Sequence, residues 1–131
     1  MTGRDYDWVG KRSECSISQV FAELKQDVER DVRRRNELRK GPTYEYEFRL
    51  AASADSITVT VDGRGTTGNQ PSISFIHHGH TIIVRDAQNR LLVEATLTLN
   101  SEKQCVFKVD RRERESWQFR MMALETLFFD F

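Results

Sequence analysis

The three histidines of this chain all lie between positions 77 and 80, at His77, His78 and His80. Neutral imidazole is the commonest side-chain ligand for metals and suits zinc and nickel. If His77 and His80 point to the same side, a carboxylate near the start of the last predicted helix, Asp110 or Glu113, could act as a third ligand. The sequence therefore suggests a metal site formed by His77, His80 and Glu113.

A β-hairpin explains the same spacing without any bound group. If His78 and Gly79 form a two-residue loop, Gly79 readily supplies the positive φ that such loops use. Three pairs then face each other on one side of the sheet: His77 with His80, Phe75 with Ile82, and Ile73 with Val84. We therefore expect a hairpin at this position and no cofactor.

Alternating apolar and polar residues predict six β-strands between positions 43 and 109. Each strand has one apolar and one largely polar side, which is typical of an antiparallel sheet covered on one face only. Short connections at 86–89 and 100–104 place Val84 opposite Leu91 and Leu99 opposite Cys105. The apolar positions of the six strands are Tyr44, Tyr46, Phe48 and Leu50; Ile57, Val59 and Val61; Ile73 and Phe75; Ile82 and Val84; Leu91, Val93, Ala95, Leu97 and Leu99; and Cys105, Phe107 and Val109.

Helical spacing comes before and after these strands. Ser16 and Gln19 have capping-box spacing before one apolar stripe, and Asp110 and Glu113 have it before another. The two stripes consist of Ile17, Phe21, Leu24, Val28 and Val32, and of Trp117, Met121, Leu124, Phe128 and Phe131.

The predicted fold is α+β. It has a long N-terminal helix, a six-stranded antiparallel meander and a C-terminal helix, with both helices packed on one face of the sheet. We expect residues 1–14 to form a flexible polar arm and residues 15–131 to form a single domain. The longest connection, 62–72, joins two strands and matches no phosphate-binding glycine motif, so it is either a loop or a lid over a ligand.

The predicted polar face of the sheet carries apolar residues at Ile76, Ile83, Leu92 and Val106. Contiguous apolar side chains on a solvated face mark interfaces more often than isolated ones do. The chain contains no GxSxG motif or other catalytic spacing. We therefore expect a small soluble, non-enzymatic protein-interaction domain that forms a homodimer through this face or binds another protein there.

An alternative function comes from the end of the first predicted helix. Six basic side chains face only Asp31 and Glu37 there, so the segment could bind a phosphate-rich ligand or a nucleic acid. The competing explanation is a solvated helix end, where cations favour the negative end of the helix dipole. The basic residues are Arg30, Arg33, Arg34, Arg35, Arg39 and Lys40.

Composition limits the remaining classes. The 20 basic and 20 acidic residues balance, so the chain has no overall attraction for polyanions. No apolar run approaches the roughly 20 residues that a membrane-spanning helix needs, and we expect no membrane contact. Cys15 and Cys105 form no CxxC pair, so we expect free buried thiols and a cytoplasmic location.

Overall fold

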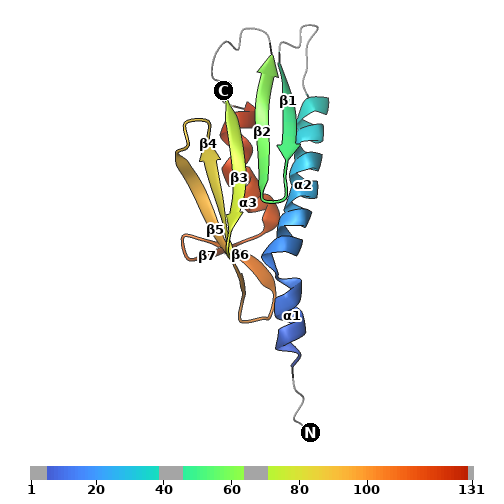
Figure 1. The fold of residues 1–131 in the computed structure, drawn as a ribbon, viewed down its shortest axis with the longest axis vertical. Helices are drawn as coiled ribbons and strands as arrows, with labels where there is room; N and C mark the ends of the chain where they lie inside the picture. The colour runs from blue at the N-terminus through green and yellow to red at the C-terminus, as the bar shows by residue number, and fades with distance from the viewer. Residues whose placement is uncertain (1–5, 39–45, 64–70, 130–131) are drawn as a thin grey trace.

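The computed structural model describes residues 6–38, 46–63 and 71–129 of the 131-residue chain. Over these residues the fold is α+β, with two helices before an antiparallel sheet and one helix after it (Figure 1). The elements in chain order are α1 (Trp8–Glu14), α2 (Ile17–Glu37), β1 (Tyr46–Ala52), β2 (Ser56–Gly63), β3 (Ser72–His78), β4 (Thr81–Asp86), β5 (Leu91–Leu99), β6 (Cys105–Val109), β7 (Arg112–Arg114) and α3 (Ser116–Phe129).

Within the described residues the sheet has seven strands that pair antiparallel in chain order, from β1 to β7. The prediction of six strands was wrong because β7 follows a two-residue turn at Asp110 and Arg111, whose φ values are 51° and 68°. Positive φ at both central residues matches the twist of a tight hairpin, but such turns usually contain glycine, so the sequence signal was weak. The last helix therefore begins at Ser116 and not at Asp110.

Cross-strand register was predicted correctly at one hairpin and incorrectly at two others. Between β4 and β5, Val84 lies opposite Val93 and not opposite Leu91 as predicted. Leu99 lies opposite Cys105, as expected. In the β3–β4 hairpin, however, His78 pairs with Thr81, so that the loop consists of Gly79 (φ 62°) and His80. The partners shift by two residues, and a shift of two leaves every side chain on the face that was predicted for it.

The core lies on one face of the sheet. Phe48 of β1 is opposite Val61, and Phe75 of β3 is opposite both Ile57 and Val84. All of these residues are buried in a single cluster that also contains the apolar sides of α2 and α3. In Figure 1, α2 runs beside β1 and α3 lies behind the middle of the sheet, and α3 contacts β3, β5 and β6.

Side chains also fix the ends and the mutual position of the helices. Ser16 accepts a hydrogen bond from the backbone N–H of Gln19 at the start of α2, as its cap position predicts. Near the other end, Asn36 donates to the Phe48 carbonyl and accepts from the Phe48 N–H, both at 2.9 Å, which joins α2 to the edge strand β1. Arg120 of α3 reaches Asp27 at 3.0 Å and Asp31 at 2.8 Å on α2.

The N-terminal segment that was expected to be an arm contains α1. Asp7 caps this helix by accepting from the Gly10 N–H at 3.0 Å, and none of its residues is buried. None of the helices within the described ranges is long and apolar enough to span a bilayer.

Candidate functional site

The outer face of β3, β4 and β5 carries an apolar patch. Ile76 lies directly opposite Ile83, and Ile83 is opposite Glu94 on its other side. The register of β4 and β5 then shifts, so that Val84 is opposite Val93 but Arg85 is opposite Leu91. The extra residue in this β-bulge is Leu92.

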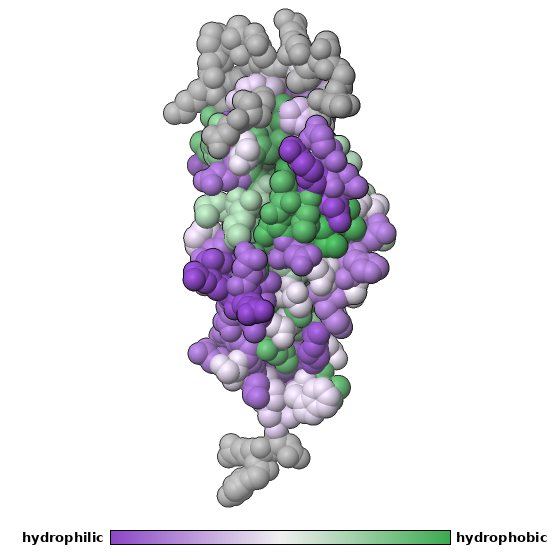
Figure 2. Space-filling model, turned by 90° about the vertical axis from the view of Figure 1, so that its left-hand side faces the viewer, coloured by the Kyte–Doolittle hydropathy of each residue, from purple (hydrophilic) through white to green (hydrophobic). Residues whose placement is uncertain are grey.

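The bulge brings two leucines to the same side of the sheet. Alternation from the inward-facing Val93 places Leu92 on the outer face, and the pairing with Arg85 places Leu91 there as well. Leu91 is 52% exposed and Leu92 is 47% exposed. Figure 2 shows apolar side chains gathered on the side of the molecule that carries β4 and β5. We call Ile76, Ile83, Leu91 and Leu92 the outer patch.

Simple alternation assigned Leu91 to the core, so sequence reasoning missed it as a surface residue. The available signal was the Leu91–Leu92 doublet, because two large apolar neighbours interrupt the period of two. Val106 is also on the outer face, but it lies opposite Thr98, roughly 13 Å along β5 from Glu94. The structure therefore brings three of the four predicted interface residues together, adds Leu91 and leaves Val106 apart.

The turn that precedes the bulge is held by Asp86. Its Oδ1 atom accepts from the backbone N–H groups of Gln88 and Arg90, and its Oδ2 atom accepts from Arg90 Nε, each at 2.9 Å. These bonds form an Asx-type turn, in which a carboxylate replaces a backbone acceptor. Asn89 has a φ of 65° within this turn. The turn fixes where β5 begins and hence where the leucines lie.

The hydrogen bond from the Arg90 backbone, more than any other contact, lowers the pKa of Asp86 below its ordinary value. Because the folded pKa lies below the unfolded one, the contribution of Asp86 to stability is full above the unfolded pKa and is lost as pH falls through the folded pKa. We expect an NMR titration to give a midpoint for Asp86 below the ordinary value of an aspartate side chain, with the amide signals of Gln88 and Arg90 following it. A midpoint at or above that value would contradict the account of this turn.

A second exposed apolar surface lies between α2 and α3. A cavity of about 370 Å³ opens there, with Arg34 and Arg35 beside it. Its exposed apolar lining consists of Leu38, Trp117, Met121 and Phe129. We refer to this surface as the helix groove. It competes with the outer patch as a place where another molecule could bind.

The arginines of α2 that the structure describes are engaged locally. Arg30 pairs with Asp27 at 3.0 Å, Arg33 with Glu29 at 3.4 Å, and Arg34 with Glu37 at 3.3 Å. Arg35 donates to the Phe128 carbonyl at 2.9 Å and lies over the rings of Phe48 and Phe129. Arg39 and Lys40 lie outside the described residues, as does most of the 62–72 connection. These local pairs offset the basic excess, and anion binding by this segment stays a prediction.

The predicted metal ligands occupy three different environments. His77 is opposite Ile82, and its ring packs edge-on against Phe21 with centroids 4.7 Å apart. His80 is in the hairpin loop, where its Nδ1 lies 3.4 Å from Arg12 Nη2, while Glu113 is on β7. No group of three or more His, Cys, Asp or Glu residues that could hold a metal ion occurs within 6–38, 46–63 and 71–129.

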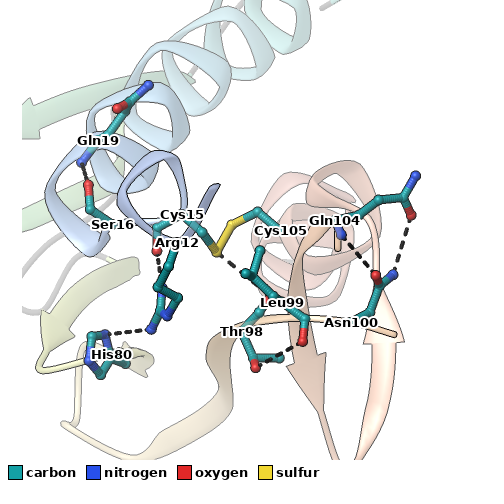
Figure 3. The surroundings of a disulfide bond; sticks show 10 residues. All are labelled: Arg12, Cys15, Ser16, Gln19, His80, Thr98, Leu99, Asn100, Gln104 and Cys105. Atoms are coloured by element: carbon teal, nitrogen blue, oxygen red, sulfur yellow. Dashed lines mark hydrogen bonds between the residues drawn. A yellow bond between two sulfur atoms is a disulfide. The ribbon is translucent and has the colours of Figure 1, made fainter. Parts of the chain in front are cut away.

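The two cysteines form a disulfide, so the prediction of free thiols was wrong. Cys15 and Cys105 are 90 residues apart in sequence, yet their Cα atoms are 5.3 Å apart. Figure 3 shows the bond joining the segment between α1 and α2 to the start of β6. Cys15 is fully buried whereas Cys105 is exposed. The expected cytoplasmic location rested on free thiols, and a disulfide removes that basis.

A larger cavity, of about 650 Å³, lies beside Cys105. Its lining includes the apolar residues Leu24 and Phe107 and, in the part of the chain that the structure describes, one basic residue, Arg114. The acidic lining residues come from α1, α2, β7 and the residue before α3: Glu14, Glu23, Asp27, Glu113 and Glu115. We refer to this space as the acidic cavity.

Comparison with known proteins adds no relative from which a function could be carried over. No protein-family model, no curated protein and no solved structure matches the chain.

Proposed function

We propose that this chain is a non-enzymatic protein-interaction domain that forms a symmetric homodimer through the outer patch. The observation that carries the proposal is the β-bulge in β5, which places Leu91 and Leu92 on the same face as the Ile76–Ile83 pair. Leu91 and Leu92 are about half exposed in the monomer, whereas Ile76 and Ile83 are partly buried. The exposed apolar surface leaves water when a second sheet covers it, and this burial favours association.

The surroundings of the patch suit a self-complementary contact. Arg85 is opposite Leu91, and Glu94 is opposite Ile83, so charges of both signs border the apolar residues. In a two-fold interface each copy presents the same surface, and a basic residue on one copy can meet an acidic residue on the other. Farther along the outer face, β2 and β3 present small polar residues such as Thr58 and Ser74, whose hydroxyl oxygens lie 2.9 Å apart. An apolar centre with a polar rim is the usual anatomy of a protein interface.

Replacement of Ile83 by Glu is expected to give a folded monomer. A carboxylate at the centre of the patch would have to be buried without a partner, and we expect dimerisation to weaken by at least about 100-fold. Sedimentation equilibrium over a range of concentrations measures the effect, and circular dichroism checks the fold. Leu92→Glu should behave in the same way.

Thr60→Glu is the matched control, because Thr60 lies on the outer face of β2, opposite Arg49 and Ser72 and away from the patch. It adds the same charge to the same face and should leave the dimer intact. A wild-type chain that stays monomeric at all concentrations would refute the proposal, as would an Ile83→Glu variant with unchanged mass.

A further inference from the structure

We propose that the Cys15–Cys105 disulfide is a redox-active site, reached by cationic and neutral thiols through the acidic cavity, and that its reduction releases α1 from the domain. This inference is independent of the proposed dimer, because the outer patch contains no residue of α1, the disulfide or the acidic cavity.

Few non-covalent contacts hold α1 against the rest of the domain. None of its residues is buried, whereas α2 buries Val20, Phe21, Leu24, Val28 and Val32. Cys15, which follows α1, is buried in the core cluster, and its Sγ lies 3.7 Å from the Thr98 carbonyl oxygen. Before Cys15, the N-terminal segment is tied to the sheet by the 3.4 Å contact of Arg12 with His80 and by Lys103, whose Nζ lies 5.2 Å from the centre of the Tyr6 ring. Exposed polar contacts of this kind are individually weak. The covalent bond at Cys15 is therefore the main link between α1 and the sheet (Figure 3).

Reduction of the disulfide begins at Cys105. Cys105 is exposed and lines the acidic cavity, while Cys15 is fully buried. A thiolate attacks Cys105 Sγ, the S–S bond breaks, and Cys15 leaves as a thiolate that takes up a proton. A second reductant thiolate then attacks the reductant sulfur of the mixed disulfide, and Cys105 leaves as a thiolate that takes up a proton. Both cysteines are then thiols, and the two reductant molecules are joined as one disulfide. Two electrons pass from the reductant to the protein.

The charge of the acidic cavity should decide which thiols reduce the disulfide fastest. Among the described residues, five carboxylates and one guanidinium line the cavity next to Cys105. Glu14 pairs with Lys11 at 3.6 Å and Asp27 with Arg120 at 3.0 Å, so the negative excess comes from the other three carboxylates. Such a lining concentrates cations and repels anions, and the effect declines as salt screens it. A thiol that carries an ammonium group should therefore react faster than a neutral one, and a thiol that carries a carboxylate should react more slowly.

The rate experiment uses the oxidised full-length chain with cysteamine, 2-mercaptoethanol and 3-mercaptopropionate. Each rate constant is expressed per thiolate and divided by the rate of the same thiol with a small neutral disulfide, which removes differences in intrinsic reactivity. Mass spectrometry after alkylation counts the thiols formed. We expect cysteamine to exceed 3-mercaptopropionate by at least about fivefold at low salt, with the ratio falling at high salt.

Glu113→Gln removes one cavity carboxylate and should reduce this ratio. Glu125→Gln removes a carboxylate beside the helix groove instead and should leave the ratio unchanged. Equal rates for the three thiols, or no reduction under native conditions, would overturn the proposal.

The release of α1 is read from backbone ¹⁵N relaxation before and after reduction. We expect heteronuclear NOE values for Trp8–Glu14 to fall to those of a mobile chain, while core residues such as Val28 and Phe75 keep their chemical shifts. A Cys105→Ser variant should show a mobile α1 without any reductant. Unchanged NOE values in α1 would overturn the proposal. Loss of the native chemical shifts throughout the chain would overturn it as well, because the disulfide would then be required for the stability of the whole domain.

Discussion

Replacement of Arg120 by methionine is expected to lower the free energy of unfolding by about 3 kcal/mol. Arg120 is 8% exposed and joins α3 to α2 through Asp27 and Asp31. Its Nη1 atom also donates to Ser116 Oγ at 3.1 Å. Removing the guanidinium leaves the partly buried Asp31 without this cation and leaves Asp27 with the exposed Arg30 alone. The loss lies at the low end for broken buried pairs because both carboxylates keep some contact with water.

Urea unfolding of the wild type and the variant measures this difference. Arg30→Met is the control, since Arg30 also pairs with Asp27 but is 65% exposed, and its loss should cost less than about 1 kcal/mol. Adding Asp31→Asn to Arg120→Met should restore part of the stability, because the uncompensated charge is removed. Equal losses for Arg120→Met and Arg30→Met would contradict this account of the contact between the helices.

The contact between Arg120 and Asp31 also affects the pKa of Asp31. Burial raises the pKa of Asp31 above its ordinary value, while the charge of Arg120 acts in the opposite direction. Because the folded pKa exceeds the unfolded one, the folded state holds this proton more tightly, and the contribution of Asp31 to stability decreases as pH rises from the unfolded pKa to the folded one. Arg120→Met should raise the pKa of Asp31 further, which carboxyl NMR detects. A lowered pKa in the variant would contradict the assignment.

Replacement of Phe119 by alanine is expected to cost about 3–5 kcal/mol of unfolding free energy. Phe119 is fully buried and stacks on Phe107 with centroids 5.2 Å apart, while the edge-to-face contact with Phe75 measures 5.9 Å. Truncation would leave a cavity between α3 and the sheet and would remove both ring contacts.

Met122→Ala is the matched control on the same helix, because Met122 is 42% exposed and should change stability by no more than about 0.5 kcal/mol. Thermal unfolding followed by circular dichroism compares the two variants with the wild type. A loss of less than about 1 kcal/mol for Phe119→Ala would show that α3 is not packed on the sheet as described.

The side of the sheet to which most strand residues point could be predicted from the sequence, because burial of one face imposes a period of two. A shift of register by two residues does not change that side. His77 illustrates this: its predicted partner was wrong, but it points toward the core as expected and meets Phe21. The start of α2 was also predictable, because the hydroxyl of Ser16 gives the helix a local cap.

The features that alternation could not predict are those that depend on tertiary geometry. The bulge at Leu92 inserts one residue into β5, and the turn at Asp110 and Arg111 places two residues other than glycine at positive φ. Neither has a strong local signal. The disulfide joins residues 90 positions apart, so no spacing motif could reveal it. Part of the candidate site, such as the position of Leu91, therefore depends on the pairing of the strands and could not be predicted from the sequence.

The most direct test of the proposed dimer is a dilution series of the wild-type chain followed by methyl NMR. We predict that the methyl signals of Ile76, Ile83, Leu91 and Leu92 shift together with concentration and fit one dissociation constant, while the buried Leu127 does not respond. Signals that do not change over the whole range would contradict self-association. Changes confined to Met121 in the helix groove would contradict the outer patch as the interface.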